Sequence, residues 1–133
     1  MYKSINLDAQ RKLFSDSPLK TPFAHQKEAF AALNKVFQIG KKKSASGMLV
    51  LPTGAGKTLT AVRWLCNHVL SKNIKVLWLA PSYYLLDQAA ATFEDNVREI
   101  PDRQTINIRC VSSSKSHAKA SSIQLPSNSH YDF

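Results

Sequence analysis

The residues with the clearest chemical potential follow an apolar run at residues 48–51. Gly54 and Gly56 have no Cβ, so the backbone there can adopt unusual dihedrals and approach a phosphate closely. Successive N–H groups would then form a concave anion site at the positive end of a helix dipole. The Lys57 ammonium can reach the β- and γ-phosphates of a nucleotide, and the Thr58 hydroxyl is placed to ligate Mg²⁺. The predicted nucleotide-binding loop comprises Thr53, Gly54, Ala55, Gly56, Lys57 and Thr58.

A strand before this loop and a helix after it are needed to hold it, and the flanking sequence predicts both. Residues 47–51 are mostly apolar and predict a strand, and residues 57–70 are apolar almost all round, which predicts a largely buried helix. Residues 74–80 predict a second buried strand, so the two strands and their crossover helix imply a parallel sheet. The full loop motif would begin with Gly where this chain has Leu51. A chance Gly-rich turn is the alternative, and the strand–loop–helix context disfavours it.

We expect further elements on both sides of this unit. They follow from helical spacing of apolar residues, from capping residues and from short apolar runs. Before the loop we expect a short helix over residues 5–16 and then a helix with Thr21 as N-cap, Pro22 in its first turn and Gly40 at its end. After the second strand we expect a third helix over residues 83–100, with Leu85, Ala89, Phe93 and Val97 on one face. A third strand over residues 105–111 and a loop over most of residues 112–129 would follow.

Composition limits the class of protein. The chain has 133 residues, of which 44% are hydrophobic and 20% charged, so we expect one globular domain at most. It has no apolar stretch that could span a membrane and no signal-peptide core, from which we expect a cytoplasmic location. Cys66 and Cys110 have no metal-ligand spacing, and we expect both to be reduced and buried.

The charge is unevenly distributed. The formal net charge is +9, and residues 1–58 carry ten Lys and Arg against three Asp and Glu. A basic first half suits a polyanionic partner, nucleic acid before a membrane surface. A solvated surface explains the charge equally well.

Three segments together resemble the first RecA-like motor domain of superfamily 2 helicases and translocases, in the branch with type I and type III restriction-enzyme motor subunits and excision-repair helicases. Residues 22–26 resemble the glutamine-containing element upstream of motif I, residues 51–58 resemble motif I, and residues 79–88 resemble motif Ia. The three in this order and spacing are much more specific than motif I alone. The resemblance covers roughly residues 20–111 and implies an α/β fold: a partial RecA-like P-loop NTPase domain, with a mostly parallel sheet flanked by helices.

The resemblance implies a role for several residues. Gln26 would contact the adenine of ATP, with an upstream aromatic or apolar side chain stacking on the base. Lys57 and Thr58 would serve ATP and Mg²⁺, and Pro81 and Ser82 would meet the backbone of a nucleic acid, with DNA favoured over RNA. Gln26 could instead be a polar first-turn residue, and Ser82 could be only the N-cap of the next helix.

The sequence also departs from the family. The Asp-Glu-x-His element, which completes the Mg²⁺ site and activates the attacking water, has no match, and neither does a second RecA-like domain with its arginine finger. Residues 129–133 resemble the stretch just before that element. We therefore expect residues 1–19 to be an N-terminal extension and residues 20–133 to be the incomplete N-terminal half of a first RecA-like domain, truncated from a longer motor.

Truncation would affect stability. In the family the motif I strand is flanked by strands that come later in the chain, and a buried unpaired backbone group costs about 1–3 kcal/mol. We expect the isolated chain to be marginally stable, or to be completed by the remainder of the motor or by a partner chain.

Three functions are consistent with these features. The first is the ATP-binding N-terminal part of an ATP-dependent DNA helicase, unable to hydrolyse ATP alone. The second is another P-loop enzyme, such as a small kinase, which the segments around Gln26 and Pro81 disfavour. The third is a non-catalytic P-loop module that binds nucleic acid or a partner protein.

Overall fold

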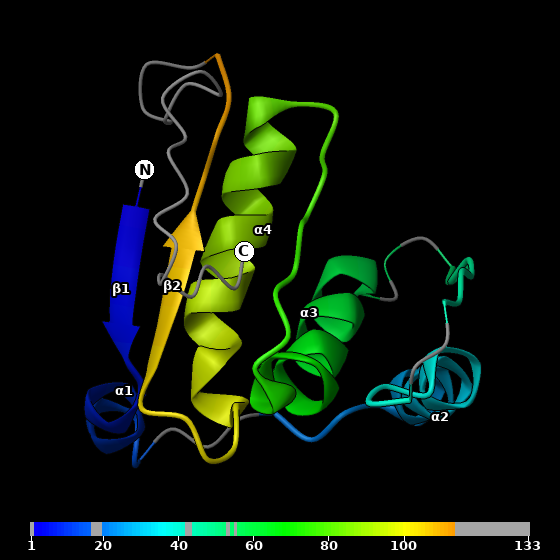
Figure 1. Ribbon diagram of the computed structural model, residues 1–133, viewed down its shortest axis with the longest axis horizontal. Coiled ribbons are helices and arrows are strands. Elements are labelled where there is room, and N and C mark those ends of the chain that lie inside the picture. Colours follow the sequence, from blue (N-terminus) through cyan, green and yellow to red (C-terminus); the bar gives the residue numbers. More distant parts are fainter. Residues whose placement is uncertain (1, 17–19, 42–43, 53, 55, 114–133) are drawn as a thin grey trace.

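The computed structural model describes residues 2–16, 20–41, 44–52, 54 and 56–113. Figure 1 shows the elements side by side, with the two strands at one end and α2 at the other. The loop expected at residues 112–129 lies almost wholly outside the described residues. The elements in chain order, with η for a 3₁₀ helix, are β1 (Tyr2–Asn6), α1 (Leu7–Leu13), α2 (Ala24–Phe37), α3 (Lys57–His68), η1 (Leu70–Lys72), α4 (Tyr83–Asn96), η2 (Val97–Glu99) and β2 (Thr105–Arg109).

The helices after the loop are as predicted, with one change of face. α3 begins at Lys57 and continues through a short 3₁₀ turn. α4 begins after Ser82, whose Oγ accepts a hydrogen bond from the Leu85 backbone at 3.3 Å, as expected of an N-cap. Leu85 was expected on the core face of α4, but this was wrong, because it is 41% exposed and Leu86 is buried instead.

The strand pairing within the described residues is antiparallel. β1 pairs with β2 so that Tyr2 lies opposite Arg109 and Asn6 opposite Thr105. The third strand was predicted, but its partner was not, since residues 5–16 were expected to be helical throughout. The helix begins only at Leu7, because Asn6 remains extended and its Oδ1 caps the Ala9 N–H at 3.0 Å.

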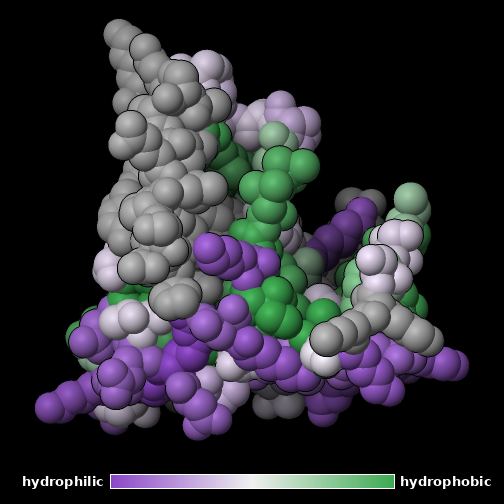
Figure 2. Space-filling model, viewed as in Figure 1, coloured by the Kyte–Doolittle hydropathy of each residue, from purple (hydrophilic) through white to green (hydrophobic). Residues whose placement is uncertain are grey.

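The segments expected to be the first two parallel strands, residues 47–51 and 74–80, have no ladder hydrogen bonds among the described residues. Residues 74–80 nevertheless alternate as a strand does. Val76, Trp78 and Ala80 pack against the core, whereas Leu77 and Leu79 are 81% and 83% exposed. Figure 2 shows a hydrophobic strip where Figure 1 places this segment. The segment therefore has one packed face and one uncovered apolar face.

The core lies where α3, α4 and β2 meet. Trp78 packs edge-on against Phe93 of α4, with ring centroids 5.6 Å apart. Both cysteines are buried, as expected, and neither belongs to a disulfide. Among the described residues no helix is long and apolar enough to cross a bilayer. The buried cluster consists of Leu7, Val62, Cys66, Leu70, Leu86, Ala90, Phe93, Val97, Ile100, Ile106, Ile108 and Cys110.

Both predicted ends of α2 were wrong by two residues. Phe23 is the N-cap, in place of Thr21, because α2 starts at Ala24. Gln38, in the left-handed region at φ 43°, is the C-cap in place of Gly40. α2 is joined to α3 by a hydrogen bond of 2.8 Å from Trp64 Nε1 to Asn34 Oδ1.

Candidate functional site

The described part of the predicted phosphate loop has the backbone that the glycines permit. Gly54 and Gly56 lie in the left-handed region, at φ 79° and 72°. A side chain is strained there, so these two positions require glycine. Thr53 and Ala55, also predicted to bind nucleotide, lie outside the described residues.

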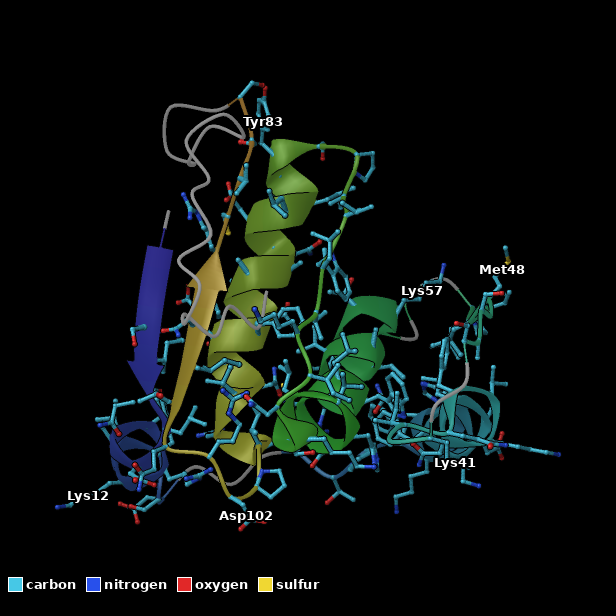
Figure 3. All side chains as sticks on the ribbon, in the orientation of Figure 1. Lys12, Lys41, Met48, Lys57, Tyr83 and Asp102 are labelled. Carbon is cyan, nitrogen blue, oxygen red and sulfur yellow. The ribbon has the colours of Figure 1, made fainter. Side chains whose placement is uncertain are left out.

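The loop leads into the N-terminus of α3. The Gly56 carbonyl accepts hydrogen bonds from both the backbone N–H and the Oγ1 of Thr60, each at 2.8 Å. Gly56, the N-cap residue of α3, has no side chain to cap the helix, and the first N–H groups of a helix with such a start are of the kind that bind anions. Lys57 is exposed at this end of α3 (Figure 3), and Thr58 is half-buried.

Gln26 lies directly against this loop. A Cβ built on Gly56 would stand 3.3 Å from Gln26 Nε2. Gln26 is 4% exposed, and its Oε1 accepts the Phe23 N–H at 3.1 Å. Phe23, the aromatic residue upstream, is 69% exposed and stacks on His25, with centroids 5.8 Å apart. The fold therefore brings Gln26 to the loop and leaves an aromatic face open beside it.

Pro81 and Ser82 are exposed at the start of α4. The Ser82 side chain is engaged as the N-cap, which fits the simpler of its two sequence interpretations. In Figure 1 α3 and α4 both begin at their upper ends and run downward, with the start of α3 well below that of α4, so the two helix N-termini point in a similar direction. The two helices are neighbours that pack against each other.

Sequence reasoning missed Arg63, the one charged side chain buried on α3. Arg63 Nε and Nη2 both donate to Glu99 Oε1, at 2.9 and 2.5 Å, and Nη1 donates to the Lys20 carbonyl at 2.6 Å. Asn67 Nδ2 donates to Glu99 Oε2 at 3.1 Å. Both side chains of the ion pair are 8% exposed. The signal in the sequence was a lone arginine within an apolar helix.

Two nearby groups have shifted pKa values. Burial is the largest cause that raises the pKa of the Cys66 thiol; together with the negative charge of Glu99, and against the opposing charge of Arg63, it brings the pKa to about 12. Burial, with Lys72 nearby, lowers the pKa of His68. The Cys66 thiol therefore stays protonated near neutral pH, which agrees with a structural role for this residue.

Metal ligands are sparse in the described structure. No group of three or more His, Cys, Asp or Glu side chains among those residues could hold a metal ion. An Mg²⁺ ion at this site would need oxygen ligands from its nucleotide, since Mg²⁺ is often held by one or two protein ligands plus phosphates. Thr58 is the residue of this loop with a hydroxyl at the helix start.

Comparison with known proteins identifies the family. The family model of the type III restriction enzyme res subunit matches residues 19–128. Searches of curated proteins and of solved structures found no match to the chain. The matched region contains Gln26, the phosphate loop and Ser82, and it covers most of the chain. The chain therefore belongs to the family of the type III restriction enzyme res subunit, and its matched region is a helicase-like, RecA-like motor domain.

Proposed function

We propose that the chain is the ATP-binding N-terminal part of an ATP-dependent DNA helicase or translocase. The observation that carries the proposal is that Gln26 Nε2 lies close to Gly56. The side chain proposed to bind adenine is therefore next to the loop proposed to bind the phosphates. In this proposal Gln26 contacts adenine, the loop from Thr53 to Gly56 cradles the phosphates, and Lys57 neutralises their charge. Family membership supports the same function.

The residues present fit ATP with Mg²⁺. The two left-handed glycines form a backbone that a Cβ would strain, and among the described residues the N-cap of α3 makes no side-chain cap hydrogen bond, as suits a helix start that binds phosphate. Thr58 would hold Mg²⁺ together with phosphate oxygens, and the bound ion would supply charge neutralisation. No residue of this chain matches the water-activating carboxylate of the family, so we propose binding without hydrolysis.

The proposed nucleic-acid contact lies at Pro81 and Ser82. It is supported by their exposure and by the similar direction in which the N-termini of α3 and α4 point in Figure 1. Backbone N–H groups at a helix start can bind phosphate oxygens without reading sequence. The family branch favours DNA over RNA as the track.

We also propose that residues 47–51 and 74–80 are strands of a mostly parallel sheet, completed by the remainder of the motor or by a partner chain. The alternating burial of residues 74–80 supports this, because Leu77 and Leu79 lie on a face that nothing described covers. Residues 1–19 are proposed as an extension that precedes the motor domain. A cytoplasmic location belongs to the same proposal.

Binding of a fluorescent ATP analogue in the presence of Mg²⁺ tests the function. Replacing Lys57 with Ala removes a charge-assisted contact of about 1.5–3 kcal/mol, which weakens binding by roughly tenfold to a hundredfold or more. Lys12→Ala is the matched control, because Lys12 is an exposed lysine at the opposite end of the molecule (Figure 3). Equal affinities for the wild type and Lys57→Ala would refute a phosphate-loop site.

The alternative is a non-catalytic module that binds nucleic acid or a protein. The exposed apolar face at Leu77 and Leu79 is the observation that favours it. Such a module would bind DNA with an affinity that falls steeply with salt and does not respond to ATP. Measuring DNA affinity over a salt series with and without ATP·Mg²⁺ separates the two functions.

A further inference from the structure

The buried Arg63 connects three segments that lie next to the family motifs in the sequence. It sits on α3, the helix that follows the phosphate loop. Its Nη1 holds the Lys20 carbonyl, at the start of the segment that leads to Gln26. Its Nε and Nη2 hold Glu99 in η2, directly after α4. One side chain therefore ties the Gln26 element to the frame formed by α3 and α4.

The link from Lys20 to Gln26 is short and stiff. Pro22 fixes its own φ and confines Thr21 to extended conformations, so the position of the Lys20 carbonyl determines where Phe23 lies. The Phe23 N–H in turn donates to Gln26 Oε1 at 3.1 Å. Gln26 Nε2 then lies against Gly56. A shift of the Lys20 carbonyl would therefore also move the Gln26 amide, which lies against the phosphate loop.

The arginine is well suited to hold this position. Its planar fork makes three hydrogen bonds to two different segments, which a lysine ammonium on a flexible stem cannot reproduce in the same geometry. Glu99 is fixed from its other oxygen by Asn67. Since both charged side chains are 8% exposed, the pair is shielded from solvent and holds one arrangement.

We propose that Arg63 is a positioning residue for nucleobase recognition: by holding the Lys20 carbonyl, it keeps the Gln26 amide in place to select adenine. The inference rests on the proposed function, in which Gln26 contacts the base. It predicts that loss of the Arg63–Lys20 contact lowers the preference for ATP over GTP. A merely structural arginine would, when lost, weaken both nucleotides equally.

The test compares variants that separate position from stability. Glu99→Gln leaves Arg63 buried without its counter-charge but keeps the donor to the Lys20 carbonyl, so it should lose stability and retain the ATP preference. The double variant Arg63→Met with Glu99→Gln removes both charges together, which is often nearly neutral for stability. It loses the Lys20 contact, so its ATP preference should fall. Arg63→Lys keeps a positive charge beside Glu99 but cannot also reach the Lys20 carbonyl. If the double variant does not fold, this variant shows whether loss of the Lys20 contact lowers the preference for ATP.

The measurement is the dissociation constant of fluorescent ATP and GTP analogues with Mg²⁺ for the 133-residue chain, with a thermal melt of each variant. The ratio of GTP to ATP dissociation constants should fall about three- to tenfold in the double variant and in Arg63→Lys, the worth of about one hydrogen bond. Glu99→Gln should keep the wild-type ratio. A wild-type ratio in the double variant or in Arg63→Lys would overturn the inference. If the wild type binds neither nucleotide, or binds both equally, it is the proposed role of Gln26 that fails.

Discussion

Replacing Gly56 with alanine tests whether the Gln26 side chain packs directly against the phosphate loop. Gly56 lies at φ 72°, where the backbone strain of an alanine lowers the free energy of unfolding by about 1–2 kcal/mol. Alanine also makes the unfolded chain less flexible, which offsets about 0.4–1 kcal/mol of this loss. The new Cβ would also stand 3.3 Å from Gln26 Nε2. The Gln26 amide must then move by a few tenths of an ångström, which weakens or breaks the hydrogen bond that it accepts from the Phe23 N–H. Such a hydrogen bond contributes about 0.5–1.5 kcal/mol. We expect a total loss of about 2 kcal/mol.

Gly54→Ala is the matched control. Gly54 has nearly the same backbone conformation, at φ 79°, but among the described residues nothing lies within 4 Å of a Cβ added there. Its substitution should therefore cost only the backbone strain, about 1 kcal/mol.

The assay is urea unfolding followed by far-UV circular dichroism, with the free energy of unfolding extrapolated to water. Gly56→Ala should be less stable than Gly54→Ala by about 1 kcal/mol, the worth of the lost hydrogen bond. Substituting Gln26 with Ala in both backgrounds should remove the difference, because the side chain that collides is then absent. Equal losses in the two single variants would refute the contact and, with it, the base-to-phosphate link on which the function is argued.

Two further predictions concern the helix that carries Lys57. Trp64→Phe removes the hydrogen bond to Asn34 Oδ1 and should lower the free energy of unfolding by about 1 kcal/mol, measured by urea unfolding; an unchanged value would show that α2 is held by apolar contacts alone. The raised pKa of Cys66, about 12, means that the folded chain keeps a proton that the unfolded chain releases above pH 9. Cys66 alone should therefore lower the free energy of unfolding by about 1.4 kcal/mol per pH unit between pH 9 and 12, so Cys66→Ala should show a shallower fall in melts over that range. Burial also raises the pKa of Cys110, which adds to the fall in both proteins. The same slope in both proteins would contradict the burial of this thiol.

Local patterns were sufficient for the helices around the loop. Gly56 and the apolar run after it placed the start of α3, and Ser82 placed the start of α4, because caps and periodicity act within a few residues. The predicted start of α2 was wrong because another residue does the work of the expected cap. Gln26, in the first turn of the helix, accepts the Phe23 N–H, so Thr21 is not needed as a cap.

Contacts between distant segments could not be predicted from local patterns. β1 is short and partly polar, and its partner β2 is nearly the whole described chain away, so nothing within residues 2–6 indicates the pairing. The same limit hid the role of Arg63. Its position among apolar residues of α3 was visible, but Glu99 and the Lys20 carbonyl reach it only in the folded structure.

The uncovered face of residues 74–80 links stability to the proposed nucleic-acid site. Fully burying a leucine contributes about 1.5–3 kcal/mol, so covering Leu77 and Leu79 would supply about 3–6 kcal/mol, a large share of the 5–15 kcal/mol typical of a domain. The same segment leads directly into Pro81 and Ser82, so whatever covers it also fixes the start of α4. A strand or chain that completes the proposed sheet would therefore stabilise the domain and order the proposed nucleic-acid contact in one step, so we expect both properties to be weaker without it.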